Sequence, residues 1–296
     1  MKNISLRTKA GKVLRARGVF GAVVAAVPIL FPPKAKTYPI CRDLVAGRSG
    51  FEIGGPSGAF RPKAALPLYP EIARLDNCNF ASQTVWEGSL SEGINFEFDP
   101  AKPKGRQYIR EATDLHSIPD QAYDFVLSCH ALEHSANPLG ALKEWMRILK
   151  ADGGIVLLLP HREPGFDRRR PVTPLQHLIE DFKQNTPEDD PTHLAETLAL
   201  TDLDRYWDVR DMDQLKERCE NNLKYRSVHH HVFTTALAVE MFNYMGMQVL
   251  SAESLRPFHI IVSAKKLPPG ETPRNEPFLD ANAAWRKNSP FKIDRV

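Results

Sequence analysis

The sequence predicts an α/β protein built on a mostly parallel sheet that is covered by helices on both faces. Apolar runs without polar alternation, typical of strands buried on both faces, occur at 123–129 and 155–159. Between them, the apolar residues of 137–149 are spaced as on one face of a helix. A strand, a helix and a second strand in this order predict a parallel pair of strands.

Seven strands are expected, and they are separated by turns and helices. They lie at 50–53, 72–75, 107–109, 123–129, 155–159, 248–250 and 259–264. The helix at 137–149 begins at Asn137-Pro138 and is followed by Asp152-Gly153-Gly154, whereas a second helix at 232–244 is ended by Gly246. Residues 161–228 are polar, charged and irregular, and they interrupt this pattern as an inserted substrate or lid segment.

These patterns divide the chain into three parts. Residues 1–45 form a basic and apolar N-terminal segment, and residues 46–266 form the folded domain, with the insertion at 161–228. The tail at 267–296 contains five prolines, and we expect it to be poorly ordered.

Composition and charge exclude several classes of protein. The chain has 296 residues, of which 42% are hydrophobic and 25% are charged, as is ordinary for a globular protein. Residues 1–42 hold nine Lys or Arg and no Asp or Glu, so the rest is net acidic, which argues against a nucleic-acid partner. Four separated cysteines without C-x-x-C argue against a zinc ribbon and fit a cytoplasmic protein.

The apolar run at 18–31 leaves three interpretations open. Its fourteen residues, which include Pro28, are fewer than the ~20 that a membrane-spanning helix needs. The run can be a helix packed on the domain or the core of a cleaved signal peptide. Alternatively, residues 1–40 make peripheral contact with the inner face of a membrane, because basic and apolar side chains together favour an interface.

Parallel sheets bind ligands at the carboxyl ends of their strands, so the residues that follow each strand are informative. The glycine-rich turn at 54–58 follows the first strand, but Pro56 and Ala59 stand where a dinucleotide-binding fingerprint needs glycine, which disfavours a nucleotide-dependent oxidoreductase. Asp76 ends the second strand, and a carboxylate there is suited to accept hydrogen bonds from two ribose hydroxyls. Residues 111–114 follow the third strand, where an acceptor could bind an adenine amino group.

Residues 51–159 resemble the class I S-adenosylmethionine-dependent methyltransferases, in particular the subgroup whose first motif reads E-I-G-G-P-S or E-I-G-P-G. The most specific block is YDFVLSCHALEHSANPLGALKEWMRILKADGGIVLLLP, and VFTTALAVEMFNYMGMQVL with HIIVSAKK resembles the last helix and strand pair. The resemblance implies a Rossmann-like doubly wound fold and S-adenosylmethionine as the cofactor. It implies an enzyme that methylates a small molecule, a sugar or a lipid-linked glycan; a non-catalytic binding protein of the same fold is the alternative.

The resemblance also implies the cofactor site, residue by residue. Its members are Glu52, Gly54, Gly55, Gly58, Asp76, Glu111, Ala112, Asp114, Ser128 and Cys129. The glycine turn would contact the methionine and ribose, and the residues after the third strand would face the adenine. Pro56 departs from the family pattern, because proline has no N–H to donate.

Histidines are the candidate bases, since a hydroxyl acceptor must lose its proton as it attacks. His130 is a candidate because it lies just after the fourth strand, and His229 and His230 because six of the ten histidines fall within 161–231. The substrate-binding candidates in the insertion are Arg168, Arg170, His177, Asp181 and His193. The insertion can instead be a solvated lid, and its scattered H-x-x-E pattern is too common to predict a metal site.

Overall fold

The structure is a computed structural model that describes residues 33–296. The apolar run at 18–31, and most of the N-terminal segment for which membrane contact is an alternative, lie outside the described residues. Within 33–296, none of the helices combines the length and the apolar character that crossing a bilayer requires.

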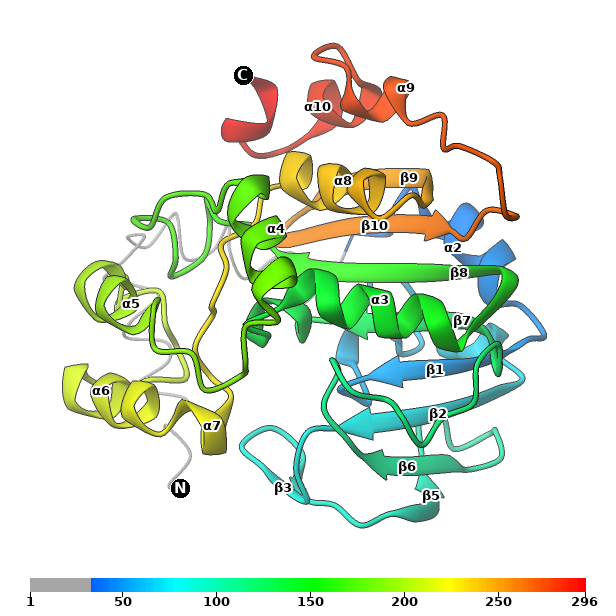
Figure 1. Ribbon diagram of the computed structural model, residues 1–296, viewed down its shortest axis with the longest axis horizontal. Helices are drawn as coiled ribbons and strands as arrows, with labels where there is room; N and C mark the ends of the chain where they lie inside the picture. The colour runs from blue at the N-terminus through cyan, green and yellow to red at the C-terminus, as the bar shows by residue number, and fades with distance from the viewer. Residues whose placement is uncertain (1–32) are drawn as a thin grey trace.

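The described chain alternates strands with helices and short 3-10 turns (Figure 1). The strands are β1 Ser49–Ile53, β2 Arg74–Asn79, β3 Gln83–Thr84, β4 Gly88–Ser89, β5 Gly93–Phe96, β6 Gly105–Ile109, β7 Tyr123–Cys129, β8 Leu149–Pro160, β9 Gln248–Leu255 and β10 His259–Lys265. The α-helices are α2 Tyr38–Val45, α3 Pro138–Ile148, α4 Leu175–Gln184, α5 Leu194–Leu200, α6 Met212–Glu220, α7 Asn222–Tyr225, α8 Thr235–Tyr244, α9 Glu276–Leu279 and α10 Ala284–Asn288. The 3-10 turns are η1 Gly58–Phe60, η2 Tyr69–Glu71, η3 Leu132–His134 and η4 Ile293–Arg295.

The main sheet has eight strands in the order β5-β6-β2-β1-β7-β8-β10-β9. The five strands from β6 to β8 are parallel, and β5, β10 and β9 are antiparallel to their neighbours. The expected count of seven is wrong by one, because β5 was not predicted. This edge strand exposes two of its four residues and lacks the apolar run that indicates a buried strand.

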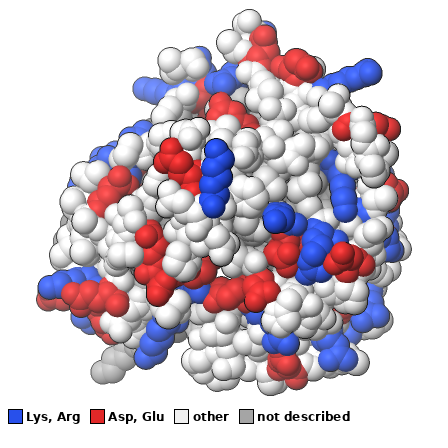
Figure 2. Space-filling model, viewed as in Figure 1, with Lys and Arg blue, Asp and Glu red and all other residues white. Residues whose placement is uncertain are grey.

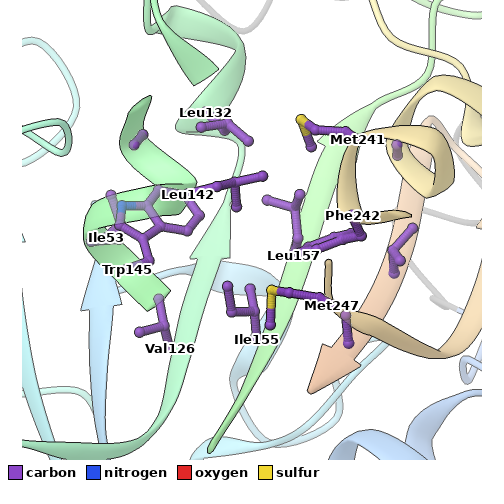
Figure 3. Packing of buried hydrophobic residues seen from close by; sticks show 14 of the residues in the cluster. Ile53, Val126, Leu132, Leu142, Trp145, Ile155, Leu157, Met241, Phe242 and Met247 are labelled. Carbon is purple, nitrogen blue, oxygen red and sulfur yellow. The ribbon is translucent and has the colours of Figure 1, made fainter. Parts of the chain in front are cut away.

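One face of the sheet packs against α3 and α8 to form the main core (Figure 3). The contacting side chains come from β1, β7 and β8 on one side and from the two helices on the other: Ile53, Val126, Ile155, Leu157, Leu142, Trp145, Met241 and Phe242. Burying each large apolar side chain contributes about 1.5–3 kcal/mol. Trp145 also donates a hydrogen bond of 3.1 Å to the Ala112 carbonyl, which ties α3 to the loop after β6.

The opposite face also carries a helix, as predicted: within residues 33–296 it is α2, whose Cys41, Leu44 and Val45 pack towards Phe125 and Val156 of the sheet. The connection from β1 to β2 contains the two turns η1 and η2 in place of an α-helix. That connection holds four prolines, at 56, 62, 67 and 70, and proline disrupts the interior of a helix.

The insertion folds beyond the carboxyl ends of β1 and β2, where α5, α6 and α7 lie together (Figure 1). It has a small core of its own, formed by Tyr206, Val209, Leu215, Cys219 and Val228. On the face in Figure 2, basic and acidic side chains are intermixed over the described surface. The insertion is therefore a packed subdomain at the ligand-binding edge of the sheet.

The prediction of a poorly ordered tail at 267–296 is wrong. Asn275 accepts a hydrogen bond of 2.8 Å from the Val249 amide of β9, and it donates to the Met247 carbonyl. Trp285 and Phe291 are buried, and the Asp294 carboxylate is buried among hydroxyl groups. These few anchors hold the tail beside α8 and β9, and a count of prolines does not reveal them.

Candidate functional site

A cavity of about 1220 Å³ lies at the carboxyl ends of β1, β2, β6 and β7. The insertion and the hairpin of β3 and β4 also contribute to its wall. Pockets for one small ligand occupy ~300–1,000 Å³, so this cavity has room for a cofactor and a second molecule.

The glycine-rich turn after β1 forms one wall of the cavity. Gly54 and Gly55 have φ values of 76° and 90°, a left-handed conformation that glycine adopts without strain. Glu52 lies beneath the turn, fully buried, and accepts hydrogen bonds from the Ser57 hydroxyl at 2.6 Å and the Tyr69 hydroxyl at 2.9 Å. Burial raises the pKa of Glu52 to about 7, although these hydrogen bonds act in the opposite direction. Glu52 thus supports the turn and does not line the cavity, contrary to the expectation of direct cofactor contact.

Asp76 is also not at the cavity. The second strand runs to Asn79, three residues beyond Asp76, which was expected to end it, so Asp76 lies inside the sheet. Its oxygens accept hydrogen bonds from the Arg106 amide at 2.7 Å and the Tyr123 hydroxyl at 2.8 Å. Asn79 occupies the carboxyl end of β2 and lines the cavity.

The residues after β6 divide into two groups. Glu111 and Ala112 line the cavity, and Glu111 accepts a 2.5 Å hydrogen bond from Arg226 of the insertion. Burial raises the pKa of Glu111 even though Arg226 opposes the shift. Asp114, in contrast, is largely exposed and is bonded to His116 at 2.8 Å, so the structure does not place it in the site.

The residues at the end of β7 also point in different directions. Cys129 and His130 line the cavity, whereas Ser128 is fully buried and absent from its wall. Within 33–296, the Ser128 hydroxyl has no hydrogen-bond partner. Burial raises the pKa of Cys129 well above its usual range, so the thiol stays protonated. His130 Nε2 lies 2.9 Å from Nδ1 of His259 on β10.

A buried acid and base pair forms the wall nearest the insertion. Nδ1 of His229 lies 2.5 Å from Asp167 Oδ2, and Nε2 of His229 lies 3.9 Å from Oε1 of Glu133. Glu133 is also near His130 and His134, at 3.6 Å and 3.9 Å. Burial would raise the pKa of Glu133, but the three histidines outweigh burial and lower it. Asp167 and Glu133 were not predicted from the sequence as members of the site.

Three of the remaining candidates serve the structure of the insertion. His230 is fully buried and bonded to Asn222 at 3.1 Å, and burial lowers its pKa to about 2. Arg170 is buried between Asp167 and Glu196, and Arg168 pairs with Asp202 at 2.7 Å. None of the three lines the cavity, where His230 was expected as a base and the two arginines as substrate contacts.

His177, Asp181 and His193 lie together but away from the cavity wall. They form, with His231, a group of four side chains that we call the histidine cluster. Its closest separations are 3.0 Å between Nε2 of His177 and His193, and 3.0 Å between His231 Nε2 and Asp181 Oδ2. Burial lowers the pKa of His193 to about 4, which favours a neutral ring.

Two exposed tryptophans also line the cavity. Trp86, on the turn between β3 and β4, has its ring centroid 5.2 Å from that of His134. Trp207 of the insertion lies 5.8 Å from Phe258. Their relative exposures are 48% and 42%, which is high for such large apolar side chains.

Comparisons with known proteins find a matching family model and similar solved structures. A family model described as a methyltransferase domain matches residues 95–157, which extend from β5 into β8. The comparison with curated proteins finds no match. Among solved structures, the chain is similar to a SAM-dependent methyltransferase from Aquifex aeolicus, with 11% identity, a TM-score of 0.43 and coverage of 87% of this chain and 98% of that one.

Two further similar structures have comparable values. A S-adenosylmethionine-dependent methyltransferase from Mesorhizobium loti has 15% identity and a TM-score of 0.44, covering 78% of this chain and 98% of its own. The 1,6-didemethyltoxoflavin-N1-methyltransferase of Burkholderia thailandensis has 10% identity and a TM-score of 0.40, covering 90% of this chain and 93% of its own. The family match over 95–157 agrees with the resemblance found in the sequence: this part of the chain matches a methyltransferase domain.

Proposed function

We propose that this methyltransferase transfers a methyl group to a hydroxyl of a sugar, either free or in a lipid-linked glycan, and that His229 is the general base. The observation that carries the proposal is the buried pair of Asp167 and His229 in the cavity wall. A hydroxyl acceptor needs a base within reach, and a histidine oriented by a carboxylate is suited to that role.

The residues around the glycine turn fit S-adenosylmethionine. Gly54, Gly55 and Gly58 expose backbone to the cavity, and a Cβ atom built on Gly58 meets nothing within 4 Å. Asn79 lies at the end of the adjacent strand, and Glu111 follows the strand after that. We assign the amino-acid end of the cofactor to the turn, the ribose to Asn79, and the adenine to Glu111 and Ala112. These polar groups follow three neighbouring strands, an arrangement suited to an elongated ligand.

S-adenosylmethionine supplies an electrophilic methyl group on a positively charged sulfur. The protein then has to orient the acceptor and remove its proton. With Nδ1–H donated to Asp167, neutral His229 keeps a lone pair on Nε2, the nitrogen nearer Glu133. His229 would take the hydroxyl proton at Nε2 as the oxygen attacks, and Asp167 would stabilise the imidazolium that forms.

The tryptophans in the cavity wall favour a sugar as the acceptor. The apolar faces of a pyranose ring pack against aromatic rings, and its hydroxyls need polar partners nearby. Trp86 and Trp207 offer the aromatic surfaces, while His134, Asp204 and Asp208 supply polar groups in the same wall. We therefore place the sugar between the two tryptophans and the base.

The proposal is tested by incubating the full chain with S-adenosylmethionine that carries a labelled methyl group. The acceptor panel contains monosaccharides, lipid-linked oligosaccharides, phenols and amines. We expect label in sugars as a methyl ether, and we expect Trp86→Ala to raise KM for the sugar more than it lowers kcat. Methylation of an amine in preference to every sugar would contradict the acceptor class. Cofactor binding without transfer to any acceptor would support a non-catalytic binding protein instead.

A further inference from the structure

We propose that the histidine cluster, formed by His177, Asp181, His193 and His231, binds a zinc ion outside the cofactor and acceptor cavity. The inference is independent of the proposed methyl acceptor, because none of the four side chains lines the cavity. The sequence alone does not predict such a site, since its four members are spread over 55 residues.

The separations between side chains of the cluster suit a shared zinc ion. His177 Nε2 lies 3.0 Å from His193 Nε2 and 3.4 Å from Asp181 Oδ2, and His231 Nε2 lies 3.0 Å from Asp181 Oδ2. The ligand atoms of the three histidines all lie within 4.8 Å of one another. Zinc–nitrogen bonds of about 2.0–2.1 Å place tetrahedral ligands about 3.3 Å apart, close to the three separations of 3.0–3.4 Å.

His231 and Asp181 each form a hydrogen bond through the atom that faces away from the cluster. This bond orients the other atom of each side chain towards the cluster. His231 Nδ1 lies 3.2 Å from the Ser135 carbonyl, which can only accept, so Nδ1 carries the proton. The other ring nitrogen, Nε2, faces the Asp181 carboxylate at 3.0 Å.

Asp181 is held in the same manner from its other oxygen. Asp181 Oδ1 accepts a 3.0 Å hydrogen bond from the Thr186 hydroxyl, which leaves Oδ2 directed at His177 and His231. Outer contacts of this kind, from a backbone carbonyl and a hydroxyl to the far atom of a ligand, are typical of metal ligands in proteins. The Nε2 atoms of His177 and His193 also face each other at 3.0 Å. This nitrogen is a common metal ligand when the imidazole ring is neutral.

The donor set indicates the metal and its role. Three imidazoles suit Zn²⁺, and the Asp181 carboxylate beside His177 and His231 would supply a fourth ligand, as in structural sites. His231 is fully buried, but the side chain of His177 is 31% exposed, so an ion can enter from solvent. The ion would join α4, the start of α5 and the segment before α8.

This site would also stabilise the catalytic region that we propose. His231 is two residues from His229, and the connection between them includes His230, whose carbonyl accepts a hydrogen bond from Arg170. Binding of zinc at His231 would therefore restrain the backbone that holds His229. The metal takes no part in methyl transfer in this proposal.

Zinc binding is measured on the full chain, which is first dialysed against a chelator and then supplied with zinc. After zinc is added, we expect about one zinc ion per chain by elemental analysis and a higher unfolding temperature than without zinc. His193→Gln and Asp181→Asn should each weaken zinc binding at least 10-fold in competition with a chromogenic chelator, because even outer-shell changes cost about 10–100-fold. His116→Gln, which alters an exposed histidine outside the cluster, is the matched control and should bind zinc as the unaltered protein does.

Cobalt provides a second readout that does not depend on any variant. Bound Co²⁺ should give the intense visible absorption of a tetrahedral site, and His193→Gln should abolish it. Glu133→Gln should leave zinc binding unchanged, because Glu133, His134 and His229 form a separate group of potential ligands in the cavity. Zinc binding that survives His193→Gln and Asp181→Asn, or that is lost in Glu133→Gln instead, would overturn the proposal. So would an unaltered chain that binds no zinc or cobalt.

Discussion

Asp167 Oδ2 lies 2.5 Å from His229 Nδ1, and the two side chains are each only 8% exposed. Arg170 donates a 3.0 Å hydrogen bond to the other oxygen of Asp167. Burial on its own would raise the pKa of Asp167, but His229 and Arg170 outweigh burial and hold that pKa below its usual range. Asp167 is thus ionised at neutral pH, and it fixes both the orientation and the tautomer of the histidine.

His229→Gln should lower the turnover number by about 10²–10⁴-fold, the usual contribution of a general base. S-adenosylmethionine affinity should stay unchanged, because His229 lies on the acceptor side of the proposed site. The measurements are transfer of labelled methyl to the sugar acceptor and calorimetry with the cofactor. His116→Gln serves as the control for removing an imidazole elsewhere. A variant with full turnover would remove His229 from the mechanism, and Glu133 would become the candidate base.

Asn79→Ala should weaken S-adenosylmethionine binding by about 2–10-fold, as expected for the loss of a hydrogen bond worth about 0.5–1.5 kcal/mol. The reason is that Asn79 lies at the carboxyl end of β2, in the cavity wall. Asp76→Ala should instead lower the free energy of unfolding, since Asp76 is bonded to Arg106 and Tyr123 within the sheet. Calorimetry and urea unfolding on both variants separate the two effects. A larger loss of affinity in Asp76→Ala, at unchanged stability, would restore the sequence-based assignment.

The contrast between Asp76 and Asn79 shows how far the sequence predicts the site. The α/β class, the strand at 123–129 and the glycine turn follow from apolar runs and turn residues, which are local signals. The end of β2 does not follow from local signals. The strand continues through the polar residues of RLDNCN, because neighbouring strands bury them. A shift of three residues in the strand end then moves the predicted ribose contact away from the cavity.

The acceptor side was less predictable for a different reason. Asp167, Glu133 and His229 are separated by up to 96 residues, and the insertion brings them together by packing on the sheet edge. Composition indicates an excess of histidines but not which of them share a wall. Histidines only two positions apart accordingly lie in different places: His229 lines the cavity, while His231 faces Asp181.

Gly55→Ala should lower the free energy of unfolding by about 1–3 kcal/mol, the usual cost of a strained backbone conformation. Gly55 has a φ of 90°, and a Cβ atom there would lie 2.5 Å from Oε1 of the buried Glu52. Gly58→Ala is the matched control, because its Cβ would meet nothing within 4 Å. It should change stability by less than about 0.5 kcal/mol, while its methyl group intrudes on the cofactor and weakens binding. If both variants unfold at the same urea concentration, the close approach of Glu52 does not restrict the residue at position 55 to glycine.

Asp294, near the end of the chain, joins the C-terminal tail to the core. Its carboxylate is fully buried and accepts hydrogen bonds from the hydroxyls of Thr235, Ser254 and Ser289 at 2.6–3.0 Å. His161 Nε2 lies 3.1 Å from its other oxygen. Burial alone would raise the pKa of Asp294, but His161 and the hydroxyls outweigh it, so the pKa is lowered.

Asp294→Asn should therefore destabilise the protein in a pH-dependent manner. Because the folded-state pKa of Asp294 is below its unfolded value of about 3.8, its stabilising contribution is fully present above pH 4 and is lost as the pH falls through the folded value. We expect a loss of about 1.5–3 kcal/mol at pH 7, as for losing hydrogen bonds to a charged group, and a smaller difference towards pH 3. Urea unfolding of both proteins over this pH range measures the difference. Glu271→Gln, an exposed change in the same tail, should have no such effect. A difference that is constant from pH 7 to pH 3 would mean that the ionised carboxylate is not what holds the tail to the core.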